Sequence, residues 1–162
     1  MSSDPAKPLS ELAEPGTTLM VATRDADGIE SRPLTVAEVR DDRLSILVDT
    51  TADWAKHLHA GEWVHVTISD TRANDFASMS GTADVDTDPA RINELWNPFA
   101  DAYFPDGRDS EGIAILDITV ESGSYWDSPN GRLGSVISLV KAKLGSAEQS
   151  GEHGDIAVDG SD

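Results

Sequence analysis

The chain has 162 residues, with 30 acidic side chains against 12 lysines and arginines, so its formal net charge is −18. This length predicts one domain, and so negative a surface argues against a general nucleic-acid binder because it repels phosphate backbones. The absence of cysteine excludes disulfides, zinc–thiolate sites and cysteine nucleophiles. No apolar run is long enough to span a membrane, and the start lacks the layout of a signal peptide. We therefore expect a soluble cytoplasmic domain.

An N-terminal arm, residues 1–14, precedes a domain that we expect over residues 15–145. Six segments of this domain have the composition or alternation of strands: 17–24, 29–39, 44–48, 64–69, 76–86 and 113–120, the last continuing less regularly towards 126. Asp27-Gly28 and Asp41-Asp42 mark turns, and Gly81 suggests a bulge. Six strands with short connections predict a mainly β fold, an antiparallel barrel that is closed or partly closed, with peripheral helices.

Three helices are predicted outside these strands. Thr51 or Asp53 can cap a short helix that ends at residue 59. The pair Asp88-Pro89 is a strong start for a second helix, which stops before Asn97-Pro98. A third helix carries its apolar residues on one face: Leu133, Val136, Ile137, Val140 and Leu144. We expect that face to dock on the barrel or on a second subunit.

The last segment, residues 146–162, holds five acids, no lysine or arginine and few large apolar groups. Such a composition cannot offset the entropy of ordering, so it predicts a disordered acidic tail. The acidity of the remaining chain indicates either a solubility surface or adaptation to high salt or desiccation. Neither interpretation points to a reaction.

Candidate chemistry starts from what is missing. The four histidines lack the spacing of zinc ligands, so no metal site is predicted. There is no nucleophile elbow, Walker loop or dinucleotide glycine fingerprint. The scarce positive charges are more informative, because Arg32 and Lys56 could hold a phosphate together with hydroxyls and amides near residues 49–51. Surface salt bridges explain the two cations equally well.

Six of the nine aromatic residues form two groups, at 96–104 and at 125–126. Core packing is the default use of such side chains. A flat ligand stacked on Trp126 is the alternative.

Four segments of the chain decide between these interpretations. They read SRPLTV, ILVDTTADWAKHL, SMSGTADVDTDPARINELWNPFADAYFPDG and GIAILDITVESGSYWDSP. In this order they resemble the general stress protein 26 family, which belongs to the pyridoxamine 5′-phosphate oxidase-like split-barrel flavoproteins. The similarity covers about residues 10–145. It implies a six-stranded FMN-binding split barrel that forms a homodimer, with two cofactor sites at the interface.

The resemblance also implies which residues meet the cofactor: Arg32, Pro33, Leu34, Thr35, Asp49, Thr50, Thr51, Lys56 and Trp126. Arg32 and Lys56 would hold the flavin phosphate. The backbone of residues 33–35 would follow the ring and ribityl chain, and residues 49–51 would meet the ring and phosphate. Trp126 would approach the ring from the partner subunit.

Two positions depart from the family pattern. Leu47-Val48 stands where members often carry an aromatic pair, and Trp54 stands where they commonly have serine. The phosphate cradle is therefore thinner than usual, and FAD is an alternative to FMN. The substrate-binding arginine and histidine of true pyridoxamine phosphate oxidases have no counterpart here, so oxidation of vitamin B6 is not predicted.

Three functions follow from the resemblance. The first is an FMN-binding stress protein that acts as an oxidoreductase, with the flavin performing the redox chemistry. The second is a stress protein that buffers flavin without turnover. The third is a deazaflavin-dependent reductase, whose cofactor has a longer acidic tail and would require more basic residues than this sequence supplies.

Overall fold

Eight strands and three short helices make up the computed structural model, which describes residues 4–127 and 152–157. The strands are β1 (Asp4–Pro8), β2 (Thr18–Asp25), β3 (Gly28–Arg40), β4 (Arg43–Asp49), β5 (Glu62–Asp70), β6 (Asp75–Asp86), β7 (Ile113–Asp127) and β8 (Glu152–Ala157). The helices are α1 (Leu9–Leu12), α2 (Pro89–Leu95) and α3 (Pro98–Tyr103). Strands β2 to β7 coincide with the six predicted segments. Within the described residues, no helix is long and apolar enough to cross a membrane.

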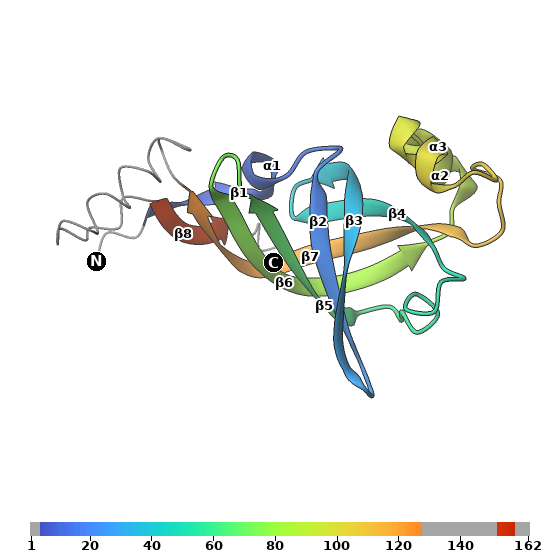
Figure 1. Ribbon diagram of the computed structural model, residues 1–162, viewed down its shortest axis with the longest axis horizontal. Helices are drawn as coiled ribbons and strands as arrows, with labels where there is room; N and C mark the ends of the chain where they lie inside the picture. Colours follow the sequence, from blue (N-terminus) through green and yellow to red (C-terminus); the bar gives the residue numbers. More distant parts are fainter. Residues whose placement is uncertain (1–3, 128–151, 158–162) are drawn as a thin grey trace.

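The six strands β2 to β7 close into a ring. Their order in the sheet is β7-β4-β3-β2-β5-β6, and β6 also pairs with β7. Each of these pairings is antiparallel. Figure 1 shows α2 and α3 at one end of the molecule and β1 and β8 at the other. The predicted mainly β fold, an antiparallel barrel with peripheral helices, is confirmed.

Alternate residues of the ring fill its interior. In β4, Leu44, Ile46 and Val48 are at most 2% exposed, and a shift of one residue would move all three to the outer face. A second, smaller cluster lies outside the ring, where Ile92 of α2 packs with Ile113 and Ile115 of β7. This outer cluster fixes α2 against the barrel.

A bulge between β6 and β7 confirms the prediction for Gly81. The register shifts between Ser80 and Gly81. A Cβ atom at position 81 would lie 1.9 Å from the carbonyl oxygen of Thr119. Only glycine lets two backbones approach this closely.

The C-terminal segment differs from its prediction. Residues 152–157 form β8, which pairs antiparallel with β7 and parallel with β1. Ile156 is 6% exposed and belongs to the main core. The average composition of the segment does not reveal that one apolar side chain can be buried, or that strand edges are available for it to pair with. The prediction of a disordered tail is therefore wrong for residues 152–157.

The helix predicted to begin at Thr51 or Asp53 does not form. Residues 51–58 make successive turns, in which the amides of Ala55 and Lys56 both donate to the carbonyl oxygen of Ala52. The Asp49 carboxylate accepts hydrogen bonds from the amide and the hydroxyl of Thr51. Local side-chain bonds of this kind compete with helix formation. The helix predicted over residues 133–144 lies outside the described residues.

Candidate functional site

Strands β3 and β4 separate before either of them ends. Their pairing runs from Arg40 and Arg43 to Val36 and Ile46 and stops there. Residues 28–35 of β3 stay paired with β2, while residues 47–49 of β4 stay paired with β7. The two strands therefore leave a gap, and each presents a backbone edge to it that no described strand pairs. Backbone N–H and C=O groups on such edges need partners.

A β-bulge marks the point where the strands part. Val36 lies opposite Ile46 and Glu38 lies opposite Ser45, so Ala37 is an extra residue in β3. Bulges bend a strand and increase its twist, and they are frequent beside active sites. The loop before β2 holds Val36 through hydrogen bonds at 2.8 and 2.9 Å. This part of β3 is thus held in place where β4 diverges from it.

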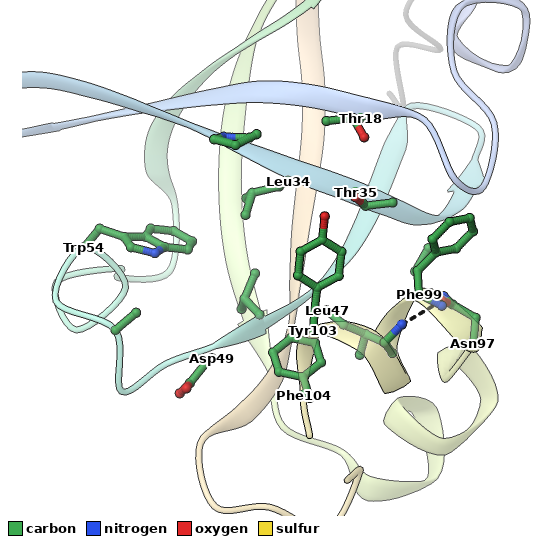
Figure 2. Close-up of a pocket in the computed structure, with 15 residues that line it drawn as sticks. Thr18, Leu34, Thr35, Leu47, Asp49, Trp54, Asn97, Phe99, Tyr103 and Phe104 are labelled. Atoms are coloured by element: carbon green, nitrogen blue, oxygen red, sulfur yellow. Dashed lines mark hydrogen bonds between the residues drawn. The ribbon is translucent and has the colours of Figure 1, made fainter. Parts of the chain in front are cut away.

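A pocket occupies the gap and opens to solvent (Figure 2). Its volume is about 200 Å³, which is below the usual range of about 300–1,000 Å³ for small-molecule sites. The lining is mainly apolar and consists of Thr18, Pro33, Leu34, Thr35, Ala37, Leu47, Val48, Asp49, Ala52, Trp54, Asn97, Phe99, Ala100, Tyr103 and Phe104.

Helix α3 supplies one wall of this pocket. The side chain of Asn97 accepts hydrogen bonds from the amides of Phe99 and Ala100, at 2.9 and 3.1 Å, and Pro98 follows at the first helical position. Asp88-Pro89 begins α2 in the same way. The sequence interpretation used this signal for α2 but took Asn97-Pro98 only as an end, and so it missed α3.

The aromatic residues at 96–104 divide between core and pocket. The ring centroids of Trp96 and Phe104 lie 5.8 Å apart, and both side chains pack on the outer cluster. Core packing is therefore confirmed for them. It is wrong for Phe99 and Tyr103, which are 54% and 68% exposed. Figure 2 shows the Tyr103 hydroxyl directed towards β3, with Trp54 and Phe99 at opposite ends of the pocket.

Four of the nine predicted cofactor residues line the pocket: Pro33, Leu34, Thr35 and Asp49. Thr50 and Thr51 instead shape the loop after β4. Both the amide and the hydroxyl of Thr50 donate to the carbonyl oxygen of Gly112, at 2.8 and 2.9 Å. The hydroxyl and the amide of Thr51 donate to Asp49, and these bonds hold the pKa of that carboxyl below its ordinary value. The amides of Thr50 and Thr51 are therefore engaged within the loop, and the helix start expected beside them does not form.

Arg32 lies beside the pocket and not in its lining. Its guanidinium donates to the carbonyl oxygens of Val21 and Glu30 and to the hydroxyl of Thr23. It also lies over the ring of Trp54, 4.5 Å from the ring centroid, a cation–π contact. Because Trp54 lines the pocket, Arg32 contacts the pocket wall through this ring.

Lys56 and Trp126 are the remaining predicted residues. Lys56 is half-exposed and forms an ion pair with Asp53 at 2.8 Å. Trp126 lies on β7, paired with Phe76 and 43% exposed. Neither lines the pocket of its own chain. The described chain therefore joins Arg32 to the pocket through Trp54 but leaves Trp126 apart from it.

Comparison with known proteins identifies the family. A family model described as pyridoxamine 5′-phosphate oxidase like matches residues 4–150. The chain belongs to this family. A curated relative, protein bli-3 of Neurospora crassa, is 23% identical over 137 residues, which cover 77% of the chain and 66% of bli-3. The alignment thus spans slightly less than two thirds of that relative.

Two solved structures are similar to this pyridoxamine 5′-phosphate oxidase-like chain. A structure from Jannaschia sp. CCS1, assigned as general stress protein 26, has a TM-score of 0.69 at 20% identity. The similar region covers 86% of this chain and 89% of the Jannaschia chain. The general stress FMN/FAD binding protein of Xanthomonas citri has a TM-score of 0.60 at 27% identity. The similar region covers 69% of this chain and 80% of the Xanthomonas chain. The resemblance to this family and its split-barrel fold is confirmed.

Proposed function

We propose that the chain is a flavin-binding protein that prefers FMN and holds the flavin ring in the pocket between β3 and β4. The separation of these strands carries the proposal, because it combines apolar walls with two backbone edges. A flat ring fits such walls, and its polar edge can bond to backbone groups. The Xanthomonas citri relative, described as an FMN/FAD binding protein, supports this assignment.

Arg32 and Lys56 are our candidates for the phosphate of FMN. Arg32 reaches the edge of the pocket against Trp54, and its one carboxylate neighbour in the described chain, Glu30 at 3.5 Å, is 70% exposed. Exposed ion pairs contribute about 0–1 kcal/mol, so a phosphate could displace Glu30 at small cost. The planar guanidinium would then offer the phosphate paired N–H donors.

We also propose that the chain functions as a homodimer. Phe99 and Tyr103 leave much of their rings exposed on an open pocket, and a second copy would cover them. The same arrangement would allow Trp126 of the partner subunit to meet the ring. Sedimentation of the purified protein should give twice the mass of the chain, and a monomer that retains full FMN affinity would contradict this part of the proposal.

The chemistry would belong to the flavin, which exchanges electrons when bound. The residues of the chain would bind the ring, orient it and keep water from its faces. Among the residues that line the pocket, only Asp49 and Tyr103 are ionisable, and none is cationic. This lining favours FMN over a deazaflavin, whose longer acidic tail would require additional positive charge.

A titration of the purified protein with FMN, riboflavin, FAD and a deazaflavin cofactor tests the proposal. We expect FMN to bind at micromolar concentration or tighter and to lose fluorescence as it enters the pocket. Failure of every flavin to bind at micromolar concentration would overturn the proposal. Rapid mixing of the FMN-loaded protein with NADH or NADPH then separates an oxidoreductase, which is reduced, from a flavin buffer, which is not.

A further inference from the structure

Asp49 is the one charged side chain among the residues that line the pocket. Its Oδ1 accepts the Thr51 amide at 2.8 Å and the Thr51 hydroxyl at 2.6 Å. Both donors favour the ionised carboxylate, and the pKa of Asp49 lies below its ordinary value for that reason. At neutral pH this residue of the pocket wall therefore carries a negative charge, on a carboxylate that is held by Thr51 and directed away from Tyr103 (Figure 2).

No cation in the pocket lining balances this charge. Arg32 is not among the lining residues; it donates to Val21, Thr23 and Glu30 and lies over the ring of Trp54. Lys56 pairs with Asp53. The chain as a whole is also strongly acidic. A ligand inside the pocket would therefore experience a negative potential that its immediate surroundings do not cancel.

The two oxidation states of a flavin differ in charge. The oxidised ring is neutral at neutral pH. Two electrons and one proton give a reduced ring with a charge of −1, and a second proton on that ring is needed to make it neutral. A carboxylate near the ring raises the free energy of the reduced anion and leaves the oxidised form nearly unaffected. Charge placed near the ring nitrogens is a recognised means by which proteins tune flavins.

We propose that Asp49 makes this pocket selective for oxidised flavin and lowers the reduction potential of the bound ring. The inference rests on the proposed flavin site, because it concerns the charge of that site. It has a second consequence. The carboxylate favours the doubly protonated, neutral reduced ring, so the reduced flavin should keep its second proton to a higher pH than it would without Asp49.

The decisive variant is Asp49→Asn, with two controls. Asparagine has nearly the same shape, and its oxygen can still accept the Thr51 amide. Asp49→Glu keeps the charge. Asp70→Asn is a matched control outside the pocket, because Asp70 also accepts two backbone amides, from Arg72 and Ala73, at the end of its strand.

The measurement is the midpoint potential of each FMN-loaded protein, from dithionite titration against a reference dye over a range of pH. For D49N we expect the affinity for reduced relative to oxidised FMN to rise about tenfold, which is about 30 mV for a two-electron couple. The break in the plot of potential against pH should move to lower pH. D49E and D70N should match the wild type, and high salt should narrow the D49N difference.

Each result decides the inference. An unchanged potential and break in a D49N protein that binds FMN would overturn it while leaving the flavin site standing. Loss of both oxidised and reduced FMN from D49N would also overturn it, because the carboxylate would then be a ligand of the ring. If D49N does not fold, Asp49→Ser carries the same expectation. Absence of FMN binding to the wild type, measured first, would instead remove the proposed function itself.

Discussion

Two arginines of this acidic chain, Arg91 and Arg32, serve contrasting regions. Arg91 reaches from α2 to the outer face of the barrel, where it donates to Asp117, Asp86 and the hydroxyl of Ser45. Asp117 is only 7% exposed. Its hydrogen bond is the main cause of the raised pKa of Arg91. The charge of Arg91 is therefore committed within the fold to the carboxylates of Asp117 and Asp86, with that of Glu38 at 3.9 Å.

Arg32 is more enclosed than Arg91, with a side chain 12% exposed against 23%, but its hydrogen bonds go to two carbonyl oxygens and a hydroxyl. The carboxylate that approaches it, Glu30, is mostly exposed. No buried carboxylate of the described chain neutralises Arg32. The comparison teaches that one arginine fastens a helix to the barrel, whereas the other keeps its charge for an anion beside the pocket.

Replacement of Arg91 should give the largest effect. Arg91→Met leaves the Asp117 carboxylate buried without its cation, and breaking such a pair costs about 3–5 kcal/mol. Urea unfolding measures the loss. Arg108→Met is the control, because Arg108 bonds to Asn93 at the surface, and exposed substitutions of this kind usually change stability by less than about 0.5 kcal/mol. Equal losses for the two variants would abolish the distinction between the two kinds of arginine.

Replacement of Arg32 should change ligand binding more than folding. Arg32→Ala, alone or with Lys56→Ala, removes positive charge that only a phosphate-bearing flavin would use. We expect FMN affinity to fall at least about tenfold, or about 1.4 kcal/mol, with riboflavin affinity nearly constant. Fluorescence titration with both ligands gives the ratio. An equal loss for the two flavins would show that neither residue contacts the phosphate.

Acid should reduce the difference in the free energy of unfolding between the wild type and Arg91→Met. Hydrogen bonds from the Asp88 amide and from Arg91 lower the pKa of Asp86 from its ordinary value of 3.8. A lowered folded-state pKa gives stability that is present above 3.8 and is lost as pH falls through the folded value. Urea midpoints of the two proteins should therefore converge below pH 3.8. A constant difference across this range would mean that Arg91 acts through packing alone.

Replacement of Trp54 should give the smallest effect, a change in the preference for FMN over riboflavin. Trp54→Ser introduces the side chain that the family resemblance leads us to expect at this position and removes the ring that Arg32 lies on. A contact of this kind contributes about 0.5–1 kcal/mol, so we expect a several-fold rise in the preference for FMN over riboflavin. Paired titrations measure it, with the oxidised ligands only. A lower preference would indicate that Trp54 positions Arg32 for the phosphate.

Sequence patterns predicted the parts of the fold that depend on local chemistry. Alternation located β2 to β7, and the Asp88-Pro89 pair located the start of α2. The same kind of pair at Asn97-Pro98 also marked α3, but it was interpreted only as the end of the preceding helix. Successive turns after Thr51 replaced an expected helix, and the Asp49 carboxylate accepts the Thr51 amide and hydroxyl at their start.

The candidate site depended on properties that no single segment carries. The gap between β3 and β4 arises from a register that ends at Val36 and Ile46, and the pairing register between two strands cannot be read from either segment alone. The contact of Arg32 with Trp54 joins residues far apart in sequence. The pairing of β8 with β1 links the two ends of the chain. The resemblance supplied Pro33, Leu34, Thr35 and Asp49, while the aromatic wall of α3 required the structure.

Amide hydrogen exchange with and without FMN tests the central claim, that the gap between β3 and β4 holds the flavin. Exchange reports local protection of backbone amides, and the amides of residues 34–35 and 47–49 border the pocket. We predict that FMN slows exchange in these two segments and leaves the strands around Arg91 unchanged. Protection confined to other parts of the barrel, with none in these two segments, would contradict the account.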